Sequence, residues 1–134
     1  MDILTKFVLA FLLTLVSLLG VMWSGWTWRT KRKRGLHLSL VALTVGLLGF
    51  TIVLALELGP AYDLEAAGWI YPVHMALARV ATVSLLLPVI TGIRVILGGE
   101  VGKAHRITAL VAFGLVAAAA VTGFWMVYLA PPVA

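Results

Sequence analysis

Four long apolar runs, separated by short polar segments, constrain this chain more than any other feature of its sequence. The runs cover about Phe7 to Trp28, Leu36 to Leu58, Trp69 to Leu97, and Ala104 to Leu129. A bilayer core of about 30 Å requires roughly 20 apolar residues in a helix, and each run is long enough. Across the chain 63% of residues are hydrophobic and only 11% are charged, which argues against a water-soluble domain. The sequence therefore predicts four transmembrane helices.

The connections between these runs are short, so consecutive helices are expected to be antiparallel neighbours. In lipid the backbone must satisfy its own hydrogen bonds, which favours helices throughout. We predict an all-α fold, an up-down four-helix bundle, in a single domain over residues 1–134. The first run ends in Trp26, Trp28 and Arg29 without a small-residue cleavage site, so we interpret it as a retained helix and not a signal peptide.

Charge is distributed unequally among the connections. The second connection holds acidic residues and no base, whereas the third holds Lys103, flanked by Arg94 and Arg106. Since positive loops stay in the cytoplasm, the first and third connections are predicted to be cytoplasmic and both termini outside, in a bacterial or archaeal inner membrane. The formal net charge of +5 needs no nucleic acid, and a patch for anionic lipid is the alternative. The first connection carries five bases: Arg29, Lys31, Arg32, Lys33 and Arg34.

Small residues and prolines mark features expected within the helices. Pro88 lies inside the third run and predicts a kink there. Small residues allow transmembrane helices to approach closely, and we expect this at four glycines and at one run of alanines. These are Gly46, Gly49, Gly114, Gly123 and the run from Ala117 to Ala120.

A weak internal repeat relates the two halves of the chain. Ser17-Leu18-Leu19 matches Ser84-Leu85-Leu86. His37 and His105 each open the following helix, and each is followed nine residues later by a glycine. The distance from serine to histidine differs by one residue between the halves. The pattern indicates two related helix pairs.

His37 and His105 are the strongest candidate ligands, because they are predicted at the same depth, at the cytoplasmic ends of their helices. Two imidazoles from facing helices suit the two axial positions of a haem b iron. Arg34, Lys103 and Arg106 are placed to neutralise the haem propionates at the membrane edge. Gly46, Gly114 and Ala117 are expected to leave room for the ring. The competing interpretation is that both histidines are interfacial residues with structural hydrogen bonds.

His74 lies near the opposite end of the third helix, and the repeat gives it Phe7 as its counterpart. It is a candidate ligand of a second haem, with Met126 as a second axial ligand, or a hydrogen-bond partner for a quinone. An interfacial histidine is the simpler alternative. Arg79 lies well inside the apolar run, where a charge is costly and usually functional or paired. We predict either an ion pair with Glu57 or an anchor for a propionate, a quinone or another subunit.

These residues resemble known families. His37 and His105, at the starts of the second and fourth helices, look like the arrangement in small membrane-bound cytochromes b and in each half of haem A synthase. The stretches Tyr71-Pro72-Val73-His74, Leu87-Pro88 and Gly102-Lys103-Ala104-His105-Arg106 are similar to bacterial four-helix proteins of the CtaM/YozB type. The resemblance covers about Arg34 to Leu129. It implies haem binding, or a part in maturation of haem–copper terminal oxidases.

Two functions from different classes follow. The first is a haem b protein that transfers electrons as a subunit of a respiratory or photosynthetic complex. The second is a non-redox accessory or assembly subunit of a membrane complex such as a terminal oxidase. A chain of 134 residues without a soluble catalytic domain is not expected to be a complete enzyme. The expected partners are the lipid bilayer and other membrane subunits.

Overall fold

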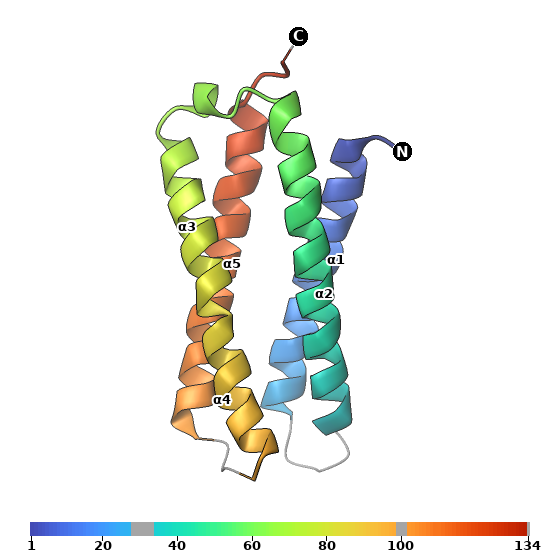
Figure 1. The fold of residues 1–134 in the computed structure, drawn as a ribbon, viewed down its shortest axis with the longest axis vertical. Coiled ribbons are helices and arrows are strands. Elements are labelled where there is room, and N and C mark those ends of the chain that lie inside the picture. The colour runs from blue at the N-terminus through green and yellow to red at the C-terminus, as the bar shows by residue number, and fades with distance from the viewer. Residues whose placement is uncertain (28–33, 99–101, 134) are drawn as a thin grey trace. The chain divides into compact units, whose positions relative to one another are not determined.

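The computed structural model describes residues 1–27, 34–98 and 102–133, which are almost entirely helical (Figure 1). No β-strand forms in these ranges apart from a single antiparallel bridge between Tyr62 and Pro132. The elements are α1 (Ile3–Trp26), α2 (Arg34–Leu58), α3 (Ile70–Ser84), α4 (Leu86–Ile96) and α5 (Lys103–Leu129), with 3-10 turns η2 (Gly59–Ala61) and η3 (Glu65–Ala67).

Four of the helical segments are long and apolar enough to cross a membrane, as the sequence predicts. Between 11% and 28% of the residues in the most apolar part of each segment are buried inside the protein. Apolar side chains therefore cover most of the exposed helix surface, which suits contact with lipid. The segments are Ile3–Trp26, Arg34–Ala61, Ile70–Ile96 and Lys103–Leu129.

The chain divides into two compact units, Met1–Ala61 and Tyr62–Ala134. We call them unit 1 and unit 2. Each contains two candidate membrane spans, so each corresponds to one half of the predicted repeat. The prediction of a single domain stays a prediction.

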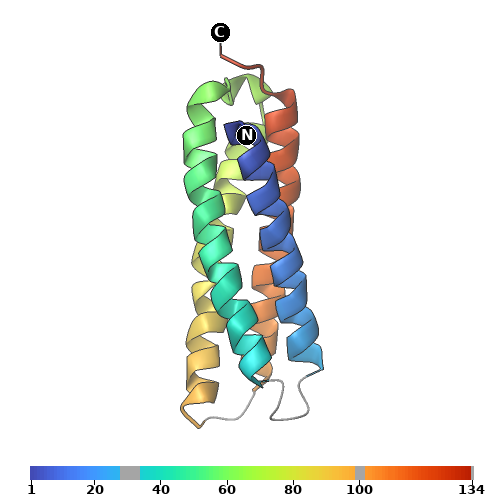
Figure 2. The ribbon, with the colours of Figure 1, turned by 90° about the vertical axis from the view of Figure 1, so that its right-hand side faces the viewer.

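In unit 1, α1 and α2 run side by side in opposite directions (Figure 2). Hydroxyl groups join them in the middle of the contact. Thr14 Oγ1 lies 3.0 Å from Thr51 Oγ1, and Thr44 Oγ1 donates to Ser17 Oγ at 3.0 Å. All four side chains are buried. Because lipid offers no competing partner, such hydrogen bonds contribute to the association of the two helices.

In unit 2, α3 and α4 form one span that is interrupted at Leu85, and α5 packs antiparallel to it. The interruption lies three residues before Pro88, where the sequence predicts a kink. Proline has no backbone N–H, so the carbonyl of Ser84 receives no α-helical hydrogen bond from residue 88. The interruption thus has a direct cause in the sequence.

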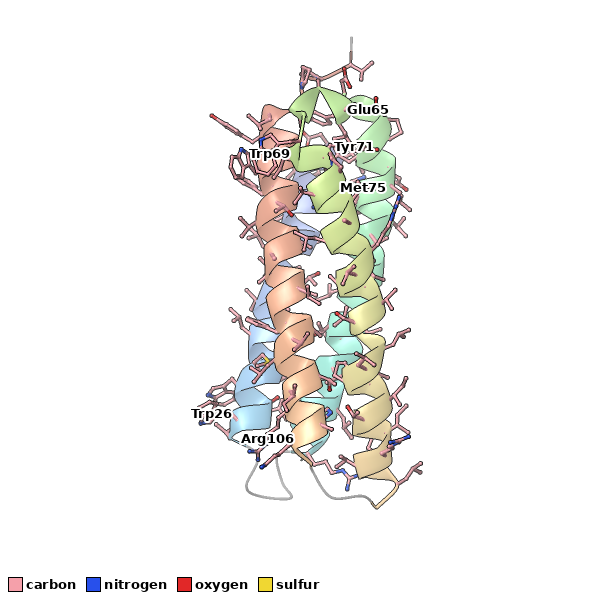
Figure 3. The ribbon with its side chains drawn as sticks, turned by 90° about the vertical axis from the view of Figure 1, so that its left-hand side faces the viewer. Trp26, Glu65, Trp69, Tyr71, Met75 and Arg106 are labelled. Atoms are coloured by element: carbon pink, nitrogen blue, oxygen red, sulfur yellow. The ribbon has the colours of Figure 1, made fainter. Side chains whose placement is uncertain are left out.

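A small cluster of apolar side chains lies at one end of unit 2. Met126 and Ile70 pack together there with Ala67, and all three are buried. Trp69, labelled in Figure 3, directly precedes α3 and meets Trp125 edge to face, with ring centroids 5.7 Å apart. Arg106 lies at the other end of the unit in the same view. The tryptophans at one end and the bases at the other fit the two edges of a membrane.

Candidate imidazole sites

His37 lies in the first turns of α2 and is buried against α1. Its Nδ1 atom is 2.9 Å from Oγ of Ser24. Gly25 is the next residue after Ser24, and a Cβ atom added to it in ideal geometry would lie 3.5 Å from Cε1 of the imidazole. A hydroxyl and a glycine of α1 thus hold one edge of the ring.

His105 has the same surroundings in unit 2. It lies in the first turn of α5, and its Nδ1 atom is 3.1 Å from Oγ1 of Thr91 on α4. An ideal Cβ at Gly92 would lie 3.3 Å from Cε1 of His105, tighter than most contacts of real side chains.

His74 is held in the same way at the opposite end of unit 2. Its Nδ1 atom is 3.2 Å from Oγ1 of Thr122 and 3.1 Å from the backbone carbonyl oxygen of Ala119. An ideal Cβ at Gly123 would lie only 2.7 Å from Cε1 of the imidazole, so that glycine cannot carry a side chain without displacing the ring.

The other hydrogen-bond partners of the hydroxyls favour one tautomer of each imidazole. A hydroxyl has one proton, and each of the three hydroxyls lies within 2.9 Å of a backbone carbonyl oxygen one turn earlier, which can only accept it. When the hydroxyl donates to that carbonyl it is the acceptor toward the imidazole, and Nδ1 then carries the proton. For His74 the carbonyl of Ala119 requires a proton on Nδ1. A neutral imidazole of this tautomer has its lone pair on Nε2.

We call this arrangement a histidine clasp: an imidazole of one helix whose Nδ1 contacts a hydroxyl, and whose Cε1 contacts the next residue, a glycine, of the neighbouring helix. The clasps of His37 and His105 occupy corresponding positions of the repeat. Ser24 and Thr91 are separated by one residue fewer in the sequence than His37 and His105 are. The structure therefore extends the repeat to the residues that hold the imidazoles.

The hydroxyl residues of the clasps, Ser24, Thr91 and Thr122, were not among the candidates from the sequence, although a spacing identifies the two threonines. Thr91 follows His74 at the same distance along the chain at which Thr122 follows His105. In both cases a glycine comes next. A histidine followed at this fixed distance by a Thr-Gly pair thus occurs once in each span of unit 2. Two antiparallel helices with this spacing place each histidine opposite the Thr-Gly pair of the other.

The predicted propionate partners lie close to the clasps in sequence. Arg34 is the first residue of α2 and is partly buried, while Lys103 and Arg106 lie in the first turn of α5 and are exposed. Arg29, Lys31, Arg32 and Lys33 of the first connection lie outside the described residues.

The predictions for small residues were partly wrong. An added Cβ at Gly46, Gly49 or Gly114 would meet no atom within 4 Å, so within its own unit none of these glycines is a point of close helix approach, whereas Gly123 is. Nine residues are two and a half helical turns, which places Gly46 and Gly114 on the opposite side of the helix from His37 and His105. They do not make room for a ring bound at those imidazoles.

The remaining candidates divide between the two units. Arg79 is exposed on α3 of unit 2, and Glu57 is exposed on α2 of unit 1, so the ion pair stays a prediction. Met126, the predicted second ligand beside His74, is 5% exposed and packs against Ala67 and Ile70.

Within the described ranges, no three His, Asp or Glu side chains come together in a group that could hold a metal ion. Single imidazoles with a lone pair on Nε2 instead suit a metal that brings its other ligands with it, as haem iron does. Comparison with protein-family models, curated proteins and solved structures finds no match to this chain. The resemblance to membrane cytochromes b and to CtaM/YozB-type proteins therefore stays a prediction.

Proposed function

We propose that this chain is a membrane-embedded b-type haem protein that transfers electrons as a subunit of a respiratory or photosynthetic complex. In this proposal His37 and His105 are the residues that would hold the iron, each through Nε2. One observation carries the proposal: Nδ1 of each imidazole lies within hydrogen-bond distance of a hydroxyl oxygen of the neighbouring helix, 2.9 Å for Ser24 and 3.1 Å for Thr91, which leaves Nε2 for the iron. A histidine that binds a metal through one ring nitrogen donates the other N–H to an acceptor in the same manner.

The chain's own residues supply the axial ligands and their orientation. The hydroxyls of Ser24 and Thr91 fix the rotation of each ring, and the adjacent glycines let the ring lie against the neighbouring helix. Arg34, Lys103 and Arg106 are the bases proposed to neutralise the propionates. A bound haem b would supply the one-electron couple, and its potential would depend on the axial ligands and their hydrogen bonds.

Visible spectroscopy of the purified full chain tests the proposal. A bis-imidazole haem b is expected to give a low-spin spectrum with a sharp reduced α-band. Replacing His37 or His105 by Ala removes one axial bond, so either variant should lose or convert this signal. His74→Ala is the matched control, because its clasp lies at the opposite end of unit 2 and the low-spin signal should survive.

A colourless protein from cells with ample haem would overturn the haem proposal. The alternative function, a non-redox accessory or assembly subunit, would then explain the four apolar spans. Retention of the low-spin signal in both single variants would also contradict the proposed ligands.

We further propose that the four segments span the cytoplasmic membrane with both termini outside. The support is the charge of the connections: Asp63 and Glu65 follow the second span, whereas Lys103 and Arg106 begin the fourth. A reporter fused after Ala134 is expected to be active only on the non-cytoplasmic side. A cytoplasmic signal from that fusion would contradict the orientation.

A further inference from the structure

Unit 2 carries two equivalent histidine clasps, one at each end of its helix pair. His105 meets Thr91 and Gly92 near the start of α5, and His74 meets Thr122 and Gly123 near the end of α5. Because the spacing from histidine to threonine is equal in the two spans, one clasp is the image of the other when the antiparallel helices are exchanged. An argument for iron ligation by His105 therefore applies to His74 as well.

The His74 clasp is the more strongly constrained of the two. Its Nδ1 atom faces two acceptors, a hydroxyl oxygen and a backbone carbonyl oxygen, and Gly123 leaves the ring no room to move toward α5. No hydrogen bond reaches Nε2 of His74 from the described residues. The hydrogen bonds of the His74 imidazole thus involve Nδ1 alone, and Nε2 keeps its lone pair for another ligand.

The repeat provides no second ligand for this site. The counterpart of His74 in unit 1 is Phe7, and the counterparts of Thr122 and Gly123 are Leu54 and Ala55. None of these three side chains can bind a metal. The chain has three histidines, and the proposed low-spin haem uses the other two.

We infer that His74 binds a second haem iron through Nε2, and that this iron has an open sixth position for a small neutral ligand such as carbon monoxide. The inference rests on the proposed function, since it assigns the same chemistry to a second imidazole. It differs in the state of the iron: the first haem is six-coordinate and low-spin, and the second is five-coordinate and high-spin. Met126 does not complete the second site, because it is buried in the cluster with Ala67 and Ile70.

The experiment uses the full-length chain, purified with haem and reduced with dithionite, with carbon monoxide as the probe. Total haem per chain and the carbon monoxide difference spectrum are measured together. We expect two haems per wild-type chain, of which one binds carbon monoxide. His74→Ala should halve the haem content and abolish the carbon monoxide signal, while the low-spin α-band is retained.

Thr122→Ser and Thr122→Val separate a lost ligand from a lost fold. Serine keeps the acceptor for Nδ1 of His74, so the carbon monoxide signal should remain close to that of the wild type. Valine removes the hydroxyl but retains the shape, and the backbone carbonyl of Ala119 remains as an acceptor for Nδ1, so haem retention at this site should weaken by less than the roughly 10- to 100-fold that loss of a sole partner to a ligating histidine causes. The low-spin α-band serves as the fold control in each variant.

Each contrary result has its own meaning. One haem per chain with no carbon monoxide signal overturns the inference and leaves the proposed function intact. A second haem that depends on His74 but excludes carbon monoxide overturns the open sixth position. A colourless protein overturns both proposals, since neither imidazole site would then hold haem.

Discussion

The two units join their helices with different side chains at corresponding positions. In the middle of unit 1, Thr14 and Thr51 contact each other across the helix pair, 3.0 Å apart. Their counterparts in the repeat of unit 2 are Ala81 and Ala119. The hydroxyl pair that links unit 1 at its centre is therefore absent from unit 2, whose helices can approach through alanines.

At one end of each unit, by contrast, unit 2 has the polar contact between its helices and unit 1 lacks it. Unit 2 has the His74 clasp there, whereas unit 1 has Phe7 and the apolar pair Leu54-Ala55. The imidazole and the Thr-Gly pair are absent together, and neither is present without the other. A polar group without a partner is costly in lipid, so the hydroxyl and the space beside the glycine stabilise an imidazole at this position. The comparison shows that the clasp is a single structural feature of two helices.

The largest expected loss of stability comes from adding a side chain at Gly123, the glycine that lies nearest to its imidazole. Gly123→Ala places a Cβ 2.7 Å from Cε1 of His74 and forces the ring away from its two acceptors. Overpacking of this kind costs about 1–3 kcal/mol. We expect the free energy of unfolding in mixed micelles to fall by that amount.

Gly25→Ala is the matched control in unit 1. Its Cβ would lie 3.5 Å from Cε1 of His37, an ordinary contact, so the stability should change little. Gly92→Ala, at 3.3 Å from His105, should fall between the two. Equal effects of the three substitutions would contradict the comparison of clasps.

A smaller effect is expected from building the missing clasp in unit 1. Phe7→His alone places an imidazole opposite Leu54, where no hydroxyl accepts from it, and also removes the stacking of Phe7 on Phe11, whose ring centroids are 6.0 Å apart. Adding Leu54→Thr and Ala55→Gly supplies the hydroxyl and the space. We expect the triple variant to recover about 1 kcal/mol relative to additivity, the net contribution of one hydrogen bond.

The control for this construction is the variant with Leu54→Thr and Ala55→Gly but with Phe7 retained. It measures the cost of removing the buried Leu54 side chain, which is 4% exposed. Additive unfolding free energies for the three sets of substitutions would show that the clasp does not form in unit 1.

Much of the fold could be predicted from apolar run length alone. The predicted starts and ends of the second and fourth helices lie within two residues of α2 and α5. The first helix begins four residues earlier than predicted, at Ile3, since Asp2 accepts a hydrogen bond from the backbone N–H of Thr5 and so caps it. Such a cap depends on a single polar side chain, which a search for apolar runs does not consider.

The candidate histidines could be found in the sequence, but their surroundings could not. Helix contacts depend on which residues of two distant segments face each other, and this register is not contained in either segment alone. The glycines at nine-residue spacing looked like part of the site but lie on the opposite helix face. Ser24, Thr91 and Thr122 were missed because hydroxyls within apolar runs commonly bond only to their own helix.

The smallest effect is expected where unit 1 differs from unit 2 at its centre. Thr14 and Thr51 each lie 2.8 Å from a carbonyl oxygen of their own helix and 3.0 Å from each other, so a hydroxyl that donates across the pair gives up its bond to the carbonyl. Because each hydroxyl keeps a partner when the other is removed, the link between them should be weak. A double-mutant cycle with Thr14→Val and Thr51→Val isolates it, and we expect a coupling of about 0.6 kcal/mol, the average for hydrogen bonds between membrane helices. Thr82→Val on α3 is the control, since its exposed hydroxyl donates only to Ala78. A coupling of zero would show that the hydroxyl pair of unit 1 adds nothing that the alanines of unit 2 lack, and packing alone would then hold both helix pairs at their centres.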